Sequence, residues 1–187
     1  MDETTLIQRA AKGETDAWEP LILAHQESVF RLAYLFLGDP DDAEDITQET
    51  FLRAYHNLKR FDTTRPLRPW LLSIAANLSR NRHRSAARHL AALARSFRAE
   101  PPESTTVEEH ALLDMDADQL WQAVRLLTAD DQQIIYLRFF LDLTTAETSQ
   151  AINVAEGTVK SRLSRAVNRL RVIVKTNFPT LAQGNEK

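Results

Sequence analysis

The stretch Glu156-Gly-Thr-Val-Lys-Ser-Arg-Leu-Ser-Arg-Ala-Val-Asn-Arg-Leu-Arg171 has the pattern of an amphipathic helix with one basic face. The basic residues lie off the apolar stripe, and no acidic residue occurs between 157 and 175. A helix that is buried on one side and basic on the other suits a duplex groove, where phosphates supply most of the affinity. An ordinary solvated basic face is the alternative. At 3.6 residues per turn the apolar stripe consists of Val159, Leu163, Ala166, Val167 and Leu170.

A shorter helix is predicted just before this one, over residues 143–152, with Thr144 or Thr145 near its N-cap. The connection Asn153-Val154-Ala155 is tight, and asparagine is one of the few non-glycine residues that tolerate the left-handed conformation. Helix, three-residue turn and basic helix form the helix-turn-helix arrangement, in which the second helix enters the major groove.

The charge of the chain is segregated, although the net charge of 187 residues is only −3. Residues 39–49 carry six acids and no base, and residues 100–118 carry seven acids and no lysine or arginine. Residues 63–99 carry eight arginines and no acid. Two basic segments separated by acidic ones predict two contacts with nucleic acid.

Several classes of protein are excluded by composition. The absence of cysteine rules out disulfides, thiolate zinc sites and a cysteine nucleophile. No apolar run approaches the roughly 18 residues of a membrane span, and the N-terminus does not resemble a signal peptide, so we expect a cytoplasmic protein. Four glycines, none in a phosphate-loop pattern, and the absence of β-branched alternation predict an all-α chain without a cofactor or a bound metal.

Two helices are predicted in the first 38 residues, over 6–12 and from about 15 to Gly38. Pro20 falls in the first turns of the second helix, which should therefore start late or bend. His25 has no second ligand to pair with and is expected at the surface or at its boundary.

The next predicted helix begins at Asp39-Pro40, an N-cap followed by proline at the first helical position. Asp41 and Asp42 suit the positive end of the helix dipole. An outward strip further along mixes acids with an exposed leucine, a combination that a protein partner explains better than solvent does. This strip holds Asp45, Gln48, Glu49, Leu52, Arg53 and His56.

The fourth helix is predicted to start with Pro69 as its first helical residue. One of its faces is rich in asparagine and arginine, the side chains that hydrogen-bond to base edges and phosphates. No acid in the segment is available to pair with these arginines, which favours nucleic acid over a merely solvated face. The face consists of Ser73, Asn77, Arg80, Asn81, Arg84 and Arg88.

A proline-containing acidic segment after this helix marks a domain boundary. The fold class predicted is two small helical domains joined by a flexible linker, the second a helix-turn-helix domain. The predicted boundaries are 1–98 for the first domain, 99–110 for the linker, 111–178 for the second domain and 179–187 for the tail.

Four segments in this order resemble the bacterial sigma factors, specifically the extracytoplasmic-function (ECF) group of the sigma-70 family: 42–55, 68–81, 127–140 and 156–165. The resemblance implies that the first segment binds core RNA polymerase, through Asp45, Gln48, Glu49 and Leu52. It implies that the second melts and reads the −10 element, through Asn77, Arg80, Asn81, Arg84 and Arg88. It implies that the last two read the −35 element, through Arg138, Thr158, Lys160, Ser161, Arg162, Ser164 and Arg165.

The resemblance further implies docking on the clamp helices of the largest polymerase subunit and on the flap of the other large subunit, as a monomer in the holoenzyme. An anti-sigma factor is an expected partner besides promoter DNA, and an unstacked non-template base is expected to enter a pocket in the −10 region. Four positions depart from the family pattern. Thr148-Ser149 replaces an Ile-Ala pair, Asn153 replaces a turn glycine, and Ala155 replaces a serine N-cap at a cost of about 1 kcal/mol.

Two other functions compete with this one. A stand-alone helix-turn-helix regulator would explain residues 107–187 but would leave the Asp45–His56 strip and the Arg80–Arg88 face unused. A metal-dependent nuclease would need Asp41, Asp42, Glu44 and Asp45 as ligands, but helical spacing spreads these carboxylates around the axis. We therefore expect a protein that is not an enzyme.

Overall fold

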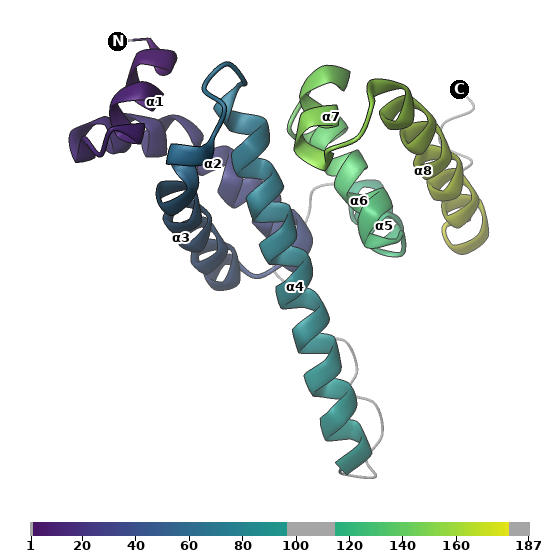
Figure 1. The fold of residues 1–187 in the computed structure, drawn as a ribbon. Helices are drawn as coiled ribbons and strands as arrows, with labels where there is room; N and C mark the ends of the chain where they lie inside the picture. The colour runs from purple at the N-terminus through teal and green to yellow at the C-terminus, as the bar shows by residue number, and fades with distance from the viewer. Residues whose placement is uncertain (1, 97–114, 180–187) are drawn as a thin grey trace.

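The computed structural model describes residues 2–96 and 115–179, with side chains for 2–85 and 118–179. All regular secondary structure in these residues is helical, as predicted (Figure 1). The predicted linker, 99–110, and the tail from 180 on lie outside the described residues. The α-helices are α1 (Glu3–Ala11), α2 (Trp18–Leu37), α3 (Pro40–Asn57), α4 (Leu67–Ser96), α5 (Met115–Arg125), α6 (Ala129–Ile135), α7 (Thr145–Ile152) and α8 (Glu156–Asn177).

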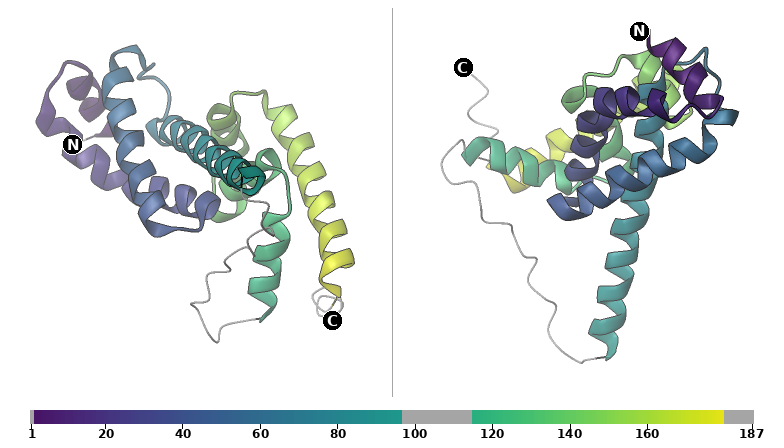
Figure 2. Two further views of the ribbon diagram at one scale, coloured as in Figure 1. Left: turned by 90° about the horizontal axis from the view of Figure 1, so that it is seen from below. Right: turned by 90° about the vertical axis from the view of Figure 1, so that its left-hand side faces the viewer.

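Helices α1 to α4 form the first helical domain, in which α2 and α3 pack against each other and against the first half of α4 (Figure 1). Gly38 ends α2 in the left-handed conformation, at φ 73°. The Asp39 carboxylate then caps α3 by accepting a hydrogen bond from the Asp42 amide at 2.8 Å, with Pro40 as the first helical residue, as predicted. The second half of α4 projects beyond both domains (Figures 1 and 2).

Two local expectations about the first domain were wrong. His25 is buried, with 7% of its surface exposed, and its Nε2 lies 3.4 Å from a Glu3 carboxylate oxygen. Burial lowers the pKa of His25, because a charged imidazole would lose its hydration there. The helix α4 starts at Leu67 rather than at Pro69, which occupies its third position, where an amide still needs no intrahelical acceptor.

Helices α5 to α8 form the second helical domain. Thr128 caps α6 through a hydrogen bond from the Asp131 amide, and a π-helical segment, Tyr136–Phe140, follows α6 directly. Tyr136 is fully buried, and its ring lies within 6 Å of those of Phe36, Trp121 and Phe140. This aromatic group anchors the domain, because aromatic side chains bury large apolar areas.

The predicted helix-turn-helix is present as α7, a three-residue turn and α8. Thr144 and Glu147 form a reciprocal capping box at the start of α7, and the backbone hydrogen bond from Thr144 lowers the pKa of the Glu147 carboxyl. Asn153 takes the left-handed conformation at φ 52°. The hydroxyl of buried Thr148 donates to the Thr144 carbonyl at 2.8 Å, so this departure from the family pattern leaves no unpaired polar group.

Ala155 begins α8 without a side-chain cap, as the sequence predicted. The variant Ala155→Ser is therefore expected to raise the free energy of unfolding by about 1 kcal/mol, because a serine oxygen would accept one of the free first-turn amides. Urea denaturation followed by circular dichroism measures the change. The control is Ala146→Ser, the same substitution at an exposed position inside α7, which should instead cost about 0.5 kcal/mol. Equal effects of the two variants would contradict the capping argument.

The two helical domains pack against each other, and one continuous group of buried hydrophobic side chains runs through both. Helix α7 lies beside the first half of α4 (Figures 1 and 2). The Phe36 ring meets the Tyr136 ring edge-on with centroids 5.1 Å apart. A side chain added at Gly38 would lie 2.6 Å from the end of the flexible Arg125 side chain, which would have to move aside, and the φ of 73° separately favours glycine at this position.

Candidate protein-binding and nucleic-acid-binding surfaces

The outward strip of α3 faces away from the core, as predicted. Asp45, Gln48 and Leu52 are exposed, and Leu52 shows 56% of its surface. Glu49 pairs with Arg53 one turn later at 2.7 Å. Tyr55, 45% exposed on the same helix, is a further apolar surface residue that the sequence reading missed. Because exposed large apolar side chains are unfavourable in water, their place among acids marks a candidate protein-binding surface.

The expectation that no acid pairs with the arginines of the α4 face was wrong for Arg80, which pairs with Asp130 of α6 at 2.9 Å. Arg82, which lies off that face, also has acidic partners. The Arg82 guanidinium pairs with the Asp42 carboxylate and lies 3.6 Å from that of Asp45. The segment 63–99 contains no acid of its own, but packing of α3 on α4 brings acids from another segment to Arg82. The Asp45 side chain remains 65% exposed, so this pairing leaves it accessible to a partner.

Of the residues expected to read the −10 element, Asn77, Asn81 and Arg84 are exposed on α4. Arg80 differs from them, because its side chain is only 19% exposed. Its two terminal nitrogens donate to Asp130 at 2.9 Å and to Asn77 at 2.6 Å. The fifth residue, Arg88, lies on the α4 backbone, but its side chain is outside the described ones.

A hollow of about 350 Å³ lies beside these residues, where α3, α4 and the segment between them meet. The Phe61 and Trp70 rings form one wall, with centroids 4.6 Å apart. Aromatic and arginine side chains of this kind can stack on and hydrogen-bond to an unstacked base. The sequence analysis did not include residues 57–61 among the candidate site residues, although they help to line this hollow. Phe61, an aromatic residue between basic and turn residues, could have indicated them. The hollow is lined by Arg53, Asn57, Arg60, Phe61, Trp70, Ile74 and Asn77.

The residues of α8 expected to read the −35 element share its outward face. Val159 and Ala166 are buried against the domain, which confirms the predicted apolar stripe. Arg169, further along α8, pairs with buried Asp131 at 2.6 Å and so holds α8 against α6. The exposed polar face consists of Lys160, Ser161, Arg162, Ser164 and Arg165, with Thr158 partly exposed at its edge.

Arg138 lies apart from these residues, in the π-helical segment. Its guanidinium donates to the Leu143 carbonyl oxygen, and its buried Nε has no hydrogen-bond partner. In this conformation the side chain supports the turn before α7, and a phosphate contact by Arg138 stays a prediction.

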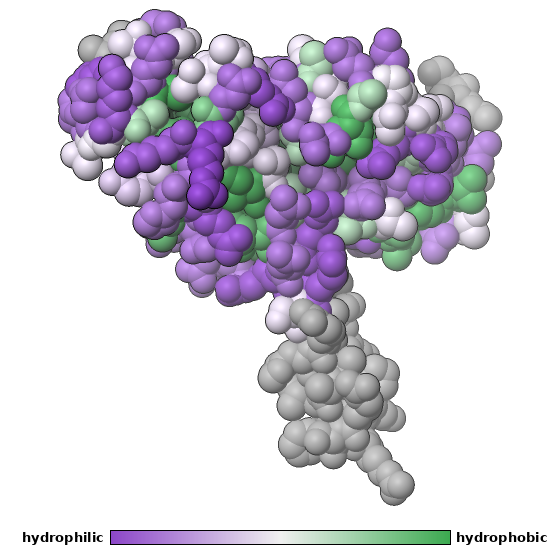
Figure 3. All heavy atoms as spheres, in the orientation of Figure 1, coloured by the Kyte–Doolittle hydropathy of each residue, from purple (hydrophilic) through white to green (hydrophobic). Residues whose placement is uncertain are grey.

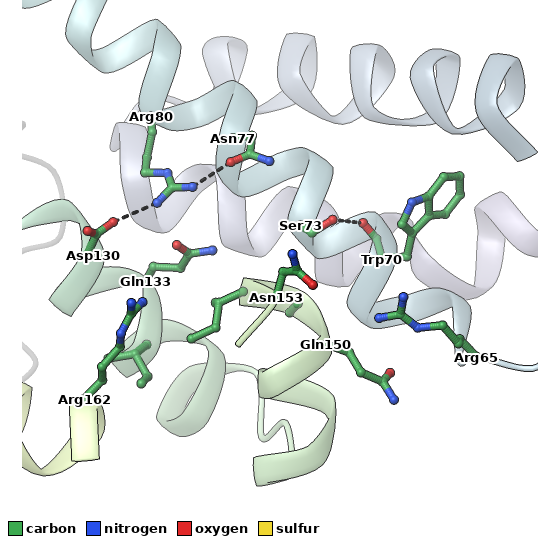
Figure 4. Close-up of a pocket in the computed structure, with 13 residues that line it drawn as sticks. Arg65, Trp70, Ser73, Asn77, Arg80, Asp130, Gln133, Gln150, Asn153 and Arg162 are labelled. Carbon is green, nitrogen blue, oxygen red and sulfur yellow. Dashed lines mark hydrogen bonds and ion pairs between the residues drawn. The ribbon is translucent and has the colours of Figure 1, made fainter. Parts of the chain in front are cut away.

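A second pocket, of about 300 Å³, opens between the two helical domains (Figure 4). Asn77 and Arg80 line it from α4, and Arg162 lines it from α8. Residues that were expected to read two separate DNA elements therefore border one pocket. The Asp130 side chain reaches Arg80 across it, as the dashed line in Figure 4 shows.

The face drawn in Figure 3 shows hydrophobic residues in separate small groups among hydrophilic ones. Among the side chains that the structure describes, those of residues 2–85 and 118–179, no group of three histidine, aspartate or glutamate side chains is placed to hold a metal ion. None of the helices described is long and apolar enough to cross a membrane.

Two family models match this chain. The model of sigma-70 region 2 matches residues 21–89, and that of sigma-70 region 4 matches residues 117–170. These ranges contain the α3 strip, the asparagine- and arginine-rich face of α4 and the helix-turn-helix.

Relatives and solved structures agree with these matches. The ECF RNA polymerase sigma factor SigL of Mycobacterium tuberculosis is 34% identical over 90% of this chain and 95% of its own, and SigW of Bacillus subtilis is 28% identical over 88% and 92%. The structure of CnrH in complex with the cytosolic domain of CnrY aligns with a TM-score of 0.67 and 25% identity, over 94% of this chain and 98% of that one. RpoE of Bartonella quintana, in complex with the anti-sigma factor NepR, aligns with a TM-score of 0.62 and 25% identity over 86% and 98%. The chain belongs to the sigma-70 family and is an ECF RNA polymerase sigma factor, a subunit that directs promoter-specific initiation of transcription.

Proposed function

We propose that the α3 strip is the surface through which this sigma factor binds the clamp helices of the largest subunit of core polymerase. The observation that carries this assignment is the 56% exposure of Leu52 among Asp45, Gln48 and Glu49. An apolar side chain surrounded by acids offers both contact area and steering toward a basic partner. The protein acts as a monomer in the holoenzyme, supplies no catalytic step of its own, and works in the cytoplasm.

The −10 element is assigned to the exposed face of α4, with Asn77, Arg80, Asn81, Arg84 and Arg88. The hollow that Phe61 and Trp70 line on one side is assigned to an unstacked base of the non-template strand. Unstacking costs a few kcal/mol, which ring stacking and hydrogen bonds from the surrounding polar side chains offset. The support for this assignment is the hollow itself, which has an aromatic wall and polar side chains in its lining.

The −35 element is assigned to the outward face of α8, which enters the major groove. Lys160, Arg162 and Arg165 supply phosphate contacts, and Thr158, Ser161 and Ser164 lie among them. Arg138 is assigned to a phosphate of the same element, which its guanidinium can contact once it no longer donates to the Leu143 carbonyl. The second domain also meets the flap of the other large subunit.

The domain boundaries proposed are 1–98 and 111–178, joined by the linker 99–110, and both family models match within the two domains. An anti-sigma factor is the proposed regulator, because two similar structures are of complexes with CnrY and with the anti-sigma factor NepR. A stand-alone regulator would leave the α3 strip and the α4 face without a role.

Run-off transcription with purified bacterial core polymerase tests these assignments. Genomic fragments, including the region upstream of this gene, serve as templates, with and without the protein. Start-site-specific transcripts that require the protein are the expected result. Tight binding of duplex DNA by the protein alone, with no transcripts, would instead support the stand-alone regulator.

The variant Lys160→Ala is expected to weaken binding of the holoenzyme to −35 DNA and to reduce the salt slope of binding by about 1, because one phosphate contact is lost. Fluorescence anisotropy at several salt concentrations measures both quantities. Lys175→Ala, an exposed position in the last turn of the same helix, is the control and should leave both unchanged. An unchanged slope in the Lys160 variant would refute the assignment.

A further inference from the structure

The pocket of about 300 Å³ between the two helical domains is given no ligand of its own by the proposed DNA and polymerase contacts (Figure 4). Its size lies at the lower end of the range of small-molecule sites. Residues of α4, α6, α7 and α8 line it, together with Arg65 just before α4 and Asn153 in the turn between α7 and α8. Side chains that converge from so many elements can contact a small molecule from several sides.

Gln133, on α6, is the most deeply buried polar residue of the pocket lining, with only 5% of its surface exposed. Figure 4 shows its side-chain amide between the guanidinium groups of Arg80 and Arg162. Among the residues that the structure describes, none forms a hydrogen bond with this amide. Burying an amide without a hydrogen-bond partner is unfavourable. Gln133 therefore favours a bound molecule that can both donate to it and accept from it.

The charge of the pocket selects an anion. Three arginines, Arg65, Arg80 and Arg162, line it together with a single acid, Asp130, so three positive charges meet one negative charge. Asp130 is engaged by Arg80 at 2.9 Å, whereas Arg65 and Arg162 have no acidic partner among the described side chains. The planar guanidinium group matches the geometry of phosphate oxygens. The pocket therefore suits a molecule that carries a phosphate group.

Amide side chains make up most of the remaining polar lining. Gln133, Gln150 and Asn153 contribute from the second domain, and Asn77 contributes from α4. An amide both donates and accepts, and in this way asparagine and glutamine recognise the edge of a nucleic-acid base, adenine in particular. Arginines next to amides are the combination that a molecule with one phosphate and one base requires.

We propose that this pocket binds a free nucleoside 5′-phosphate. The guanidinium groups of Arg65 and Arg162 hold the phosphate, and the Gln133 amide hydrogen-bonds to the edge of the base. A free nucleotide is favoured over a nucleotide within a DNA strand, because the pocket is bordered on both sides by helical domains and its volume suits a small molecule. The inference goes beyond the proposed function, and its test needs neither polymerase nor promoter.

Isothermal titration calorimetry of the full-length protein tests the proposal. The probes are AMP, GMP, CMP and UMP, with the matching nucleosides and inorganic phosphate as the separate components of each ligand. The expected result is one-to-one binding of at least one mononucleotide, at least tenfold tighter than binding of its nucleoside or of phosphate. Absence of binding by all four would mean that water fills the pocket, and equal binding of nucleotide and phosphate would mean an unspecific anion site. Either result would overturn the proposal.

The variant Gln133→Leu separates a binding role from a structural one. It should bind the nucleotide about tenfold more weakly, while its urea midpoint stays the same or rises, because a buried amide without a partner is removed. The control is Gln132→Leu, the next residue of α6, whose Nε2 donates to the Arg125 and Leu127 carbonyls at 3.0 Å each. This control should lower the urea midpoint and keep the nucleotide affinity. Wild-type affinity in Gln133→Leu would overturn the proposal.

Arg65→Ala tests the phosphate contact, since Arg65 is exposed and is assigned to neither DNA nor polymerase. It should weaken nucleotide binding about tenfold, whereas Arg31→Ala, an exposed position on α2, should leave it unchanged. Equal losses in both variants would show that only the overall charge matters and would overturn the site. A single-stranded oligonucleotide that binds more tightly than the mononucleotide and loses affinity in Gln133→Leu would also overturn it, because the pocket would then belong to a DNA-binding surface.

Discussion

Replacing Tyr136 with alanine is expected to lower the free energy of unfolding by about 3–5 kcal/mol, the usual cost of removing a large aromatic side chain from a core. Tyr136 is fully buried and touches the rings of Trp121 and Phe140 in its own domain and of Phe36 in the other. The variant should therefore lose both the stability of the second domain and its contact with the first. Urea denaturation and binding of −35 DNA by the holoenzyme measure the two effects.

The matched control is Tyr136→Phe, which keeps the ring and removes only the hydroxyl. This hydroxyl is buried without a hydrogen-bond partner, and burial raises the pKa of Tyr136 far above its usual range. Because an unsatisfied buried hydroxyl costs about 1–3 kcal/mol, the phenylalanine variant should be as stable as wild type or more stable. A loss of several kcal/mol in Tyr136→Phe would show that the hydroxyl, rather than the ring, stabilises the domain.

Replacing Leu52 with aspartate is expected to weaken binding to core polymerase at least about 30-fold, which corresponds to the roughly 2 kcal/mol that defines an interface hot spot. The substitution removes apolar contact area and adds an unpaired charge to a surface that would become buried. Because Leu52 is exposed, the isolated protein should unfold at nearly the wild-type urea concentration. Competition with a labelled wild-type sigma factor for core polymerase measures the affinity.

Leu23→Asp is the control for this prediction, since Leu23 is 62% exposed on α2 but lies outside the α3 strip. It should retain core affinity. The milder variant Gln48→Ala should lower the affinity by a smaller factor without changing stability. If the Leu52→Asp variant binds core polymerase with wild-type affinity, the α3 strip is not a polymerase-binding surface.

The sequence predicted those parts of the fold that depend on local chemistry. The N-cap at Asp39, the left-handed Asn153 and the uncapped start of α8 at Ala155 each follow from the conformational preferences of one or two residues. The apolar stripe of α8 follows from helical periodicity, because periodicity alone decides which residues share a face.

Expectations that depended on neighbours far along the chain were less successful. His25 was expected near the surface, yet it is buried on α2, with its Nε2 close to Glu3 of α1. The residues around His25 in the sequence do not indicate that another helix packs over it. The arginines of the α4 face were expected to lack acidic partners, yet Arg80 pairs with Asp130 of α6. Arg82, which lies off that face, meets Asp42 and Asp45 across the α3–α4 contact. Charge counted along a sequence does not include pairs that packing creates.

The sequence by itself determined that this chain is all-helical with one acidic strip and two basic surfaces, because helical period and residue type set these features locally. Its likeness to the sigma factors came from the order of four motifs along the chain. Only the tertiary structure decided that the two basic surfaces line a common pocket and that Arg80 donates a hydrogen bond to the Asp130 carboxylate. The physical reason is that 50 residues separate Arg80 from Asp130. Their meeting depends on burial of Phe36 against Tyr136, a contact that no local pattern encodes.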